Sequence, residues 1–479
     1  MAGCPLTESD LVRPNRTEMK RLVVFLLILL PALWAADVLP SSPKGQLVRQ
    51  YLDAFNGGEA AMRAFLEGAP AGPPVEERIA RYRRMKSDVG SLTPIRFVAE
   101  DAESLQVIVR TADGRDLSLT AMIAGEKPHI EGLRIEPVED NAPEKASGPP
   151  EEEKVVLAQI QDLVGKKDKA GQFSGTVLIA RGSEVIWQGA YGFANDATHV
   201  PNQSDTRFDV GSIAKSFTRV AIGQLLEQGK LKLTDKVGMY LPDYPNPTVR
   251  DQVTIEQLLD MRSGIGDFFG EKFQAASKES IRTLRDYLPF FAADPLQFPP
   301  GTQRQYSNGG YIVLGLIIEK IAGQSYYDYV QKNIFEPAGM KNSSFGFRNS
   351  GDPKQAIGST TMSASGTESP AEQRHSNLNL LPARGSSAGS AQSTVADLLL
   401  YTQALDAGKL ISPATMATLD IHPDDMGIAG GAPGLNASLD TGIKSAGPAS
   451  YAVVVLSNFD PPYAERLSEE IRGLLRRAK

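Results

Sequence analysis

The feature that most constrains the fold is the placement of the strand-like segments, which lie near both ends of a long helical stretch. Residues 175–180 and 185–192 are apolar runs separated by a short turn, and residues 451–458 form a similar run far along the chain. Short runs rich in Val and Ile are typical of buried strands, whereas the residues between them repeat at helical spacing. We therefore predict one antiparallel sheet built from both ends of a domain, flanked by helices and carrying an inserted helical lobe.

The chain is too long for a single core. Its 479 residues favour two or three structural units. Residues 137–153 are rich in proline, glycine and acidic side chains and are expected to form a linker. This linker separates a small α+β domain at 41–136 from a larger α+β domain at 154–479.

The small domain is expected to contain three helices and then four strands. The helices are predicted near 46–56, 60–66 and 74–86, and the strands near 95–99, 105–110, 117–123 and 129–135. This order, with the phrase Tyr-Leu-Asp-Ala-Phe-Asn at 51–56, resembles the cone-shaped fold of the nuclear-transport-factor and ketosteroid-isomerase superfamily. That resemblance implies a ligand pocket, and a spacer or dimerisation role is the alternative.

Residues 1–40 have the pattern of an export segment. Met-Lys-Arg at 19–21 precedes a mostly apolar run that ends in Ala35-Ala36-Asp37. A basic start, a short apolar stretch and small residues at its end predict a signal peptide, and Pro31 argues against a stable spanning helix. We expect an exported protein, periplasmic or secreted. The alternative is an uncleaved anchor, with membrane association through residues 21–39.

Composition narrows the classes of function. The net charge is -7 with both signs interspersed, so no basic stripe suggests nucleic-acid binding. The single cysteine, Cys4, excludes disulfides within a chain, and the four histidines are scattered without metal-ligand spacing. We expect no metal and no cofactor, and a small molecule or peptide as the substrate.

The strongest chemical motif is Gly-Ser-Ile-Ala-Lys-Ser-Phe at 211–217, which opens a predicted helix. Ser212 and Lys215 are three residues apart and therefore share a helix face. A serine hydroxyl with a lysine partner is the minimum apparatus of a nucleophile and its base. A helix N-terminus also favours developing negative charge.

A second candidate segment is Tyr306-Ser307-Asn308, between a Pro-Pro-Gly turn and a predicted buried helix. A loop at such a junction can project a phenol and an amide into a cleft. These residues could supply the further proton-transfer group that a serine–lysine pair needs.

Taken together, these segments resemble the serine β-lactamase and penicillin-binding-protein superfamily, and more closely its class C β-lactamase branch with related esterases and D-aminopeptidases. Further matching phrases are Arg-Ser-Gly-Ile-Gly-Asp-Phe at 262–268 and Phe-Glu-Pro-Ala-Gly-Met at 335–340. The resemblance implies an acyl-enzyme at Ser212, with Lys215 as proton acceptor and Tyr306 as proton shuttle. It also implies that Asn308 binds Lys215 or the substrate.

The third family motif departs from the pattern. The family normally places Lys-Thr-Gly or His-x-Gly on the edge strand, whereas this chain has Gly-Ile-Ala-Gly-Gly-Ala-Pro-Gly at 427–434. The glycines align, so Gly430 and Gly431 could still form the oxyanion and substrate-binding edge through their backbone. Ile428 stands where a basic residue is expected. Lys444 lies after this strand, in a predicted turn, and is not accepted as a substitute.

Losing that cation weakens the case for substrates with a carboxylate, such as β-lactams or D-Ala-D-Ala peptides. It favours an esterase or amidase acting on a neutral substrate, and a catalytically degenerate binding protein is the alternative. A rival nucleophile, Ser387 in Gly-Ser-Ser-Ala-Gly at 385–389, matches the elbow of α/β-hydrolases. That elbow needs a buried strand before it, and Pro382 interrupts the segment that would have to form this strand. The segment is instead predicted to be a loop lining the same cleft.

Overall fold

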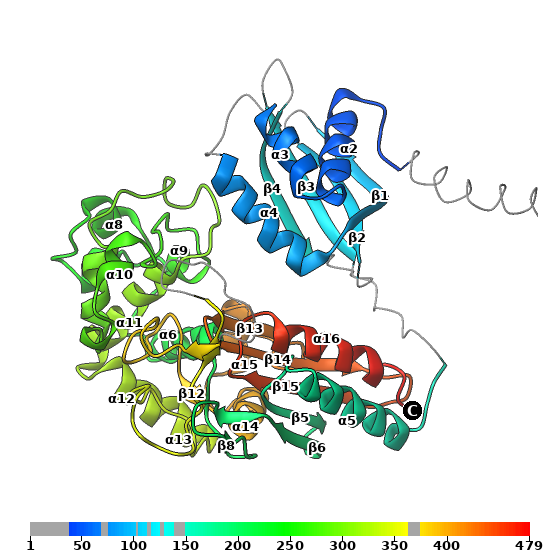
Figure 1. The fold of residues 1–479 in the computed structure, drawn as a ribbon. Coiled ribbons are helices and arrows are strands. Elements are labelled where there is room, and N and C mark those ends of the chain that lie inside the picture. Colours follow the sequence, from blue (N-terminus) through cyan, green and yellow to red (C-terminus); the bar gives the residue numbers. More distant parts are fainter. Residues whose placement is uncertain are drawn as a thin grey trace, which may run out of the picture. The chain divides into compact units, whose positions relative to one another are not determined.

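The computed structural model describes residues 38–68, 75–101, 104–112, 116–124, 129–137, 149–362 and 374–479. The chain divides into two compact units, residues 1–144 and 145–479 (Figure 1). The predicted export segment lies almost wholly outside the described residues, as does most of the predicted linker. Within the described ranges, no helix has the length and apolar character needed to cross a bilayer.

The first unit is a four-stranded antiparallel sheet covered by helices. Its elements are α2 (Pro43–Asn56), α3 (Glu59–Glu67), α4 (Val75–Val89), β1 (Leu92–Glu100), β2 (Ser104–Thr111), β3 (Asp116–Ala124) and β4 (His129–Pro137), with the strands in the order β1-β2-β3-β4. Helix α2 begins three residues before the predicted start because Ser42 caps it, accepting a hydrogen bond from the Gly45 N–H at 3.0 Å. Phe55 and Val107 are fully buried between the helices and the sheet. The likeness of this unit to the nuclear-transport-factor fold stays a prediction.

The second unit contains the predicted sheet built from distant segments. Its strands are β5 (Gly175–Arg181), β6 (Glu184–Tyr191), β13 (Gly427–Ala432), β14 (Leu435–Lys444) and β15 (Ser450–Ser457). They lie in the order β13-β14-β15-β5-β6, and every neighbouring pair is antiparallel. The α+β class and the joining of early and late strands are thus confirmed.

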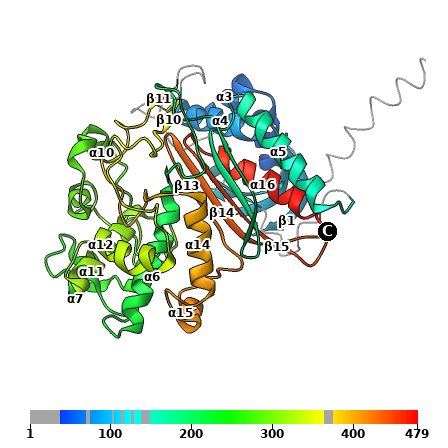
Figure 2. The ribbon, with the colours of Figure 1, turned by 90° about the horizontal axis from the view of Figure 1, so that it is seen from below.

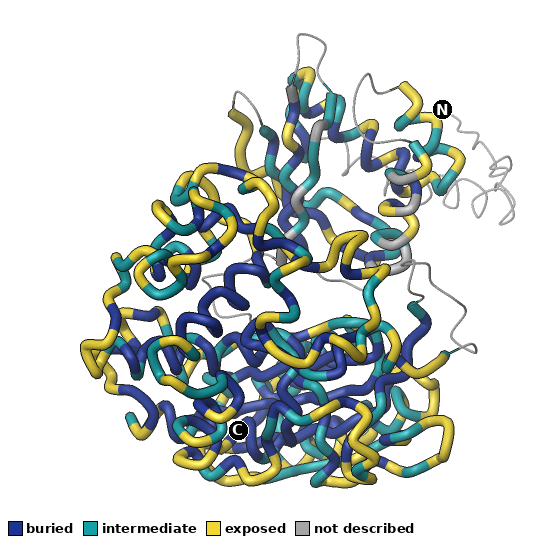
Figure 3. Tube along the Cα trace, turned by 90° about the vertical axis from the view of Figure 1, so that its left-hand side faces the viewer, coloured by how far each residue is buried: buried dark blue, intermediate teal, exposed yellow. Residues whose placement is uncertain are grey.

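Helices cover both faces of the sheet (Figure 2). The side chains of its strands alternate between the two faces. Val177 and Val455 pack under α5 (Glu153–Lys169) and α16 (Tyr463–Leu475), whereas Leu178 and Val454 belong to the core beneath α6 (Ala214–Glu227) and α14 (Val395–Asp406). Successive strand residues point to opposite faces, so a run of apolar residues fills both cores. The buried residues accordingly concentrate in the interior of this unit (Figure 3).

The helical lobe lies between β6 and β13 in sequence. Its helices, besides α6 and α14, are α7 (Val237–Tyr240), α8 (Pro247–Gln252), α9 (Ile255–Leu259), α10 (Glu271–Ala275), α11 (Asn308–Ala322), α12 (Tyr326–Val330), α13 (Glu336–Ala338) and α15 (Pro413–Thr418). Short strands join its loops: β7 (Phe193–Asn195), β8 (Val200–Pro201), β9 (Phe208–Asp209), β10 (Ser359–Thr360), β11 (His375–Ser376) and β12 (Gln392–Ser393).

Strand β14 corrects the prediction for Lys444. This residue is the last of β14 rather than part of a turn, and it pairs with Ser450. The sequence does not show a regular strand pattern near Asp440. A register irregularity between Asp440 and Ile443 interrupts the alternation of apolar and polar residues there. Lys444 still cannot replace the missing cation. Gly431 pairs with Asn436, about 26 Å away from Lys444 along the strand.

Candidate active site

Ser212 lies in a single 3₁₀ turn, Gly211–Ile213, that leads directly into α6. Gly211 has φ +51°, and a Cβ there would lie 2.9 Å from the backbone nitrogen of Gly431. Glycine at this position therefore allows the turn to approach strand β13 closely. The preceding Asp209 fixes the turn, since its Oδ1 accepts a hydrogen bond from the Gly211 N–H at 2.9 Å.

Asp209 also ties this turn to a distant segment of the chain. Its other carboxylate oxygen forms an ion pair with Arg348, and both side chains are largely buried. Such a buried pair fixes the segment before the nucleophile, and removing one partner would leave a buried charge uncompensated. Sequence reasoning misses this contact because the two residues are 139 positions apart.

Lys215 reaches Ser212 as its helical spacing predicts. Its Nζ lies 3.1 Å from Ser212 Oγ and 2.7 Å from Asn308 Oδ1, and it also donates to the carbonyl of Ala388. Asn308 is itself oriented by Asp267, whose Oδ2 accepts from Asn308 Nδ2 at 2.6 Å. The amine thus has one hydroxyl and two carbonyl-type oxygens as partners.

Tyr306 completes the group. Its hydroxyl lies 2.6 Å from Ser212 Oγ, and its ring centroid lies 4.7 Å from Lys215 Nζ. The next residue, Ser307, caps α11 by accepting from the Gly310 N–H at 2.9 Å. The cap turns the chain so that the residues on either side of Ser307 face the nucleophile. The structure therefore brings Ser212, Lys215, Tyr306 and Asn308 together.

Burial sets the protonation states. Desolvation lowers the pKa of Lys215 to about 7, although the carboxylate of Asp267 acts in the opposite direction. Desolvation also raises the pKa of Tyr306, and the hydrogen bond from Ser212 acts against that rise. Near neutral pH the phenol stays protonated, and a large share of Lys215 is a neutral amine.

The neutral amine suits the observed contacts. An uncharged amine has two N–H donors and one lone pair. With the donors directed at Asn308 Oδ1 and the Ala388 carbonyl, the lone pair faces the hydroxyl of Ser212. The arrangement can therefore accept the serine proton.

Strand β13 lies on another side of the Ser212 site. It is the end strand of the sheet, so its outer backbone groups have no strand partner. A Cβ on Gly430 would lie 2.2 Å from the carbonyl oxygen of Val210 and 2.6 Å from the amide nitrogen of Ser212. The backbone of Gly430 and Gly431 therefore lies beside the Ser212 amide, where a pair of N–H groups could hold an oxyanion.

Ile428 shares a strand face with Gly430, because the two are separated by one residue. Its side chain is half-buried and packs against the core beneath α6. An apolar side chain thus fills the position for which the resemblance predicts a cation.

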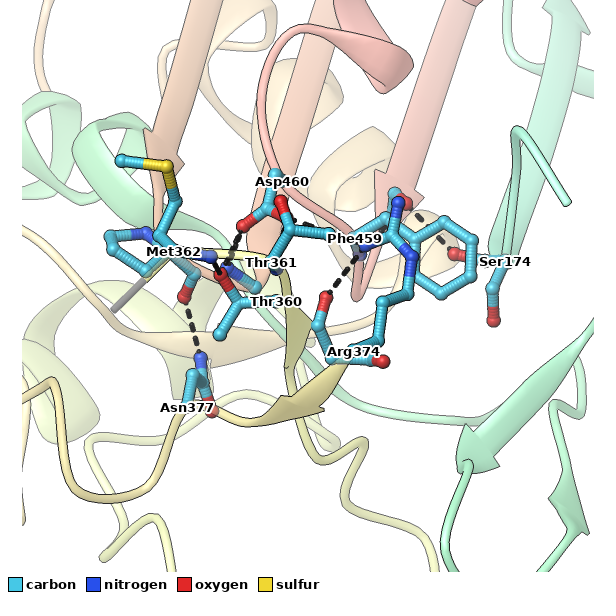
Figure 4. Close-up of polar contacts among 12 residues, drawn as sticks. Ser174, Thr360, Thr361, Met362, Arg374, Asn377, Phe459 and Asp460 are labelled. Carbon is cyan, nitrogen blue, oxygen red and sulfur yellow. Dashed lines mark hydrogen bonds and ion pairs between the residues drawn. The ribbon is translucent and has the colours of Figure 1, made fainter. Parts of the chain in front are cut away.

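A buried carboxylate that sequence reasoning missed holds the turn after β13 (Figure 4). Asp460 Oδ1 accepts from the Gly434 N–H at 2.8 Å and from Thr360 Oγ1 at 2.5 Å. Its Oδ2 accepts from the Thr361 N–H at 2.9 Å and Arg374 Nη1 at 3.3 Å. Asp460 therefore ties the end of the sheet, the β13–β14 turn and the β10–β11 segment to one another. An acidic residue directly after a buried strand was the available signal.

The rival nucleophile is not built for catalysis. Ser387 is fully buried and its hydroxyl has no hydrogen-bond partner, while His422 is exposed and contacts only the neighbouring Asp420. The 385–389 segment instead serves the Ser212 site, as the carbonyl of Ala388 accepts from Lys215. Among the described residues, no three His, Cys, Asp or Glu side chains cluster as a metal site would require.

Comparisons with known proteins find a matching family model and several relatives. The family model described as Beta-lactamase matches residues 160–474. "Penicillin-binding protein 4*" of Bacillus subtilis (strain 168) is 35% identical over 186 residues, or 38% of this chain and 40% of that protein. "Protein flp" of Staphylococcus aureus (strain MRSA252) is 30% identical over 203 residues, or 42% of this chain and 40% of that protein. The chain thus matches well under two thirds of the length of these two relatives.

Among solved structures, the chain is similar to a penicillin binding protein from Bacillus halodurans. The TM-score is 0.56 at 29% sequence identity, and the match covers 65% of this chain and 98% of that one. The family match, residues 160–474, lies within the second unit.

Proposed function

The chain belongs to the beta-lactamase family, and on this premise we propose that it is an exported serine hydrolase that cleaves a neutral ester or amide through an acyl-enzyme at Ser212. The observation that carries the proposal is the contact network of Lys215. The amine lies 3.1 Å from Ser212 Oγ and 2.7 Å from Asn308 Oδ1, with the phenol of Tyr306 2.6 Å from the same serine oxygen. A binding protein would have no need to maintain this arrangement.

Acylation follows from these positions. Neutral Lys215 takes the hydroxyl proton of Ser212 as Oγ bonds to the substrate carbonyl carbon. The N–H groups of Ser212 and Gly431 stabilise the oxyanion. Protonated Tyr306 then donates its proton to the departing alkoxide or amine, and the ammonium of Lys215 restores that proton.

Deacylation uses the same groups. Water attacks the acyl carbon and its proton passes through Tyr306 to Lys215. The C–O bond to Ser212 breaks, and the serine oxygen takes the proton back. The products are a carboxylic acid and the free enzyme. No step needs a cofactor or metal.

Labelling with a fluorophosphonate tests the nucleophile. We expect intact-protein mass to show one adduct on the native protein and none on Ser212→Ala, because the Lys215 amine lies 3.1 Å from the Ser212 oxygen and can accept its proton. Ser387→Ala is the matched control and should still be labelled, since that buried hydroxyl has no hydrogen-bond partner among the described residues. A folded native protein that stays unlabelled would contradict the proposal and favour a catalytically degenerate binding protein.

Ile428 supports a neutral substrate. We expect Ile428→Lys to raise hydrolysis of a carboxylate-bearing β-lactam about tenfold relative to a neutral ester, because a charge-assisted hydrogen bond stabilises binding by about 1.5–3 kcal/mol. Ile428→Met keeps an apolar side chain and is the control. Kinetics with nitrocefin and p-nitrophenyl acetate measure the ratio. Native activity that already favours nitrocefin would mean that carboxylate recognition does not depend on this position.

Export is supported by the basic and apolar sequence before Asp37. N-terminal sequencing of the secreted protein should find a new terminus after Ala35 or Ala36.

A further inference from the structure

A cavity of about 390 Å³ lies between the helical lobe and the turn that follows β13. Phe269 and Phe273 line one side, Leu380 and Leu381 another, and Pro433 a third. This volume lies in the range typical of small-molecule sites. Phe269 is 47% exposed, although its ring lies 5.1 Å from the ring of Phe273. Most of the lining is apolar or aromatic, as is typical of small-molecule sites.

Three chain segments place this cavity next to the nucleophile. Phe269 follows Asp267, the residue that orients Asn308. Pro433 follows Gly431 on the strand beside Ser212. The leucine pair precedes the 385–389 loop, which supplies a carbonyl to Lys215. Because each of these segments connects a residue of the Ser212 site to a residue of the cavity lining over two to seven positions, the cavity lies near the site.

Among the described residues, the cavity lining presents no free cation. Lys278 lines it, but its Nζ donates to three backbone carbonyls, those of Phe273 at 2.6 Å, Gln274 at 3.2 Å and Ala276 at 2.8 Å. Glu279 is exposed and lies 3.6 Å from Arg282. The remaining polar lining consists of neutral side chains. A charged group would lose its hydration here without gaining a free partner of opposite charge.

Resting on the proposed function, we propose that this cavity binds the acyl part of the substrate, and that this part is an uncharged apolar group such as a medium-length alkyl chain or a phenyl ring. The leaving group must meet the phenol of Tyr306, which is not part of the cavity lining. The acyl part extends from the carbonyl along β13, past Gly431 towards Pro433, and so enters the cavity.

Alkylphosphonate p-nitrophenyl esters test this assignment. Ser212 Oγ bonds to phosphorus and the P–O bond to p-nitrophenolate breaks, so each reaction is followed by colour. The alkyl group on phosphorus occupies the acyl position. We expect a hexyl group to react roughly 200-fold to 1,000-fold faster than a methyl group, since it buries five more methylenes and each contributes about threefold to fourfold.

Two variants test whether the preference for the hexyl group arises in this cavity. Phe269→Ala should lower the hexyl-to-methyl ratio about tenfold, because it removes an apolar wall. Ala276→Phe should also lower it by filling the cavity. Phe193→Ala is the control, since Phe193 is 38% exposed but lies on β7, outside the lining. Reaction without chain-length preference, or a preference only for long alkoxy groups on phosphorus, would overturn the assignment while leaving Ser212 as nucleophile. Failure of every probe would overturn the nucleophile and the assignment together.

Discussion

Lys215→Met is expected to lower the rate of fluorophosphonate labelling and of ester hydrolysis about a thousandfold or more. The substitution keeps the length and the apolar stem of the side chain but removes the group that accepts the Ser212 proton, and general-base catalysis contributes about 10²–10⁴-fold. Stopped-flow or steady-state kinetics would measure the loss. Lys272→Met, which changes an exposed lysine of α10, is the matched control and should keep full activity.

The Lys215→Met variant also tests how activity depends on pH. Native activity should rise as pH increases through about 7, because burial lowers the pKa of Lys215 to about 7 and only the neutral amine accepts a proton. The residual activity of Lys215→Met should lack that step. A native profile without a rise near this pH would contradict the role of Lys215 as base.

Replacing Lys215 should affect stability in the opposite direction to activity. The pKa of Lys215 is lower in the folded chain than the 10.5 of a free lysine, so the unfolded chain binds more protons between the two values. The free energy of unfolding from this group therefore rises with pH between about 7 and 10.5, and the group destabilises the fold most below pH 7. We expect Lys215→Met to be more stable by about 1–2 kcal/mol at pH 6, as measured by chemical denaturation.

Gly430→Ala is the second substitution with a large expected effect. Its Cβ would lie 2.2 Å from the Val210 carbonyl oxygen and 2.6 Å from the Ser212 amide nitrogen, so β13 must move away from the nucleophile. The oxyanion would then lose a well-placed donor, which costs about 10²–10³ in kcat. We expect kcat to fall by this factor, with a smaller change in KM.

Gly427→Ala provides the control on the same strand. Its added Cβ would meet only Asp440 Oδ1, at 3.9 Å, which is ordinary contact. This variant should keep native kinetics, and circular dichroism should show both variants folded. Equal losses in the two variants would show that the strand tolerates no side chain anywhere, and that the effect does not come from the approach to Ser212.

The parts of the site that could be predicted are those fixed by local geometry. Ser212 and Lys215 are one helical turn apart, and Asn308 begins a helix whose cap is visible in the sequence. Their meeting across 93 positions rested on the resemblance to a family. Asp267, which orients Asn308, and Asp460, which holds the turn after β13, could not be found in this way, because their contacts come from tertiary packing.

Burial distinguishes two neighbouring phenylalanines whose positions the sequence leaves open. Phe268 and Phe269 are adjacent in sequence, and either could line the cleft or fill the core. The structure buries Phe268, at 4% exposed, and leaves Phe269 open beside the cavity. Asp267 Oδ1 fixes the turn at this point by accepting from the Phe269 N–H at 3.2 Å, and the two ring centroids lie 4.4 Å apart at the edge of the core.

The strand order of the sheet has a consequence for how the protein matures. Strand β5 pairs with β15, joining Gly175 to Ser457, and the oxyanion strand β13 lies beyond β15 and β14. The centre of the sheet therefore cannot form until almost the whole chain has been synthesised. Pairings between such distant segments form slowly, since a long loop must close first. We expect a growing chain to carry Ser212 and Lys215 for hundreds of residues of synthesis without hydrolytic activity, and to acquire that activity only when its last strand is in place.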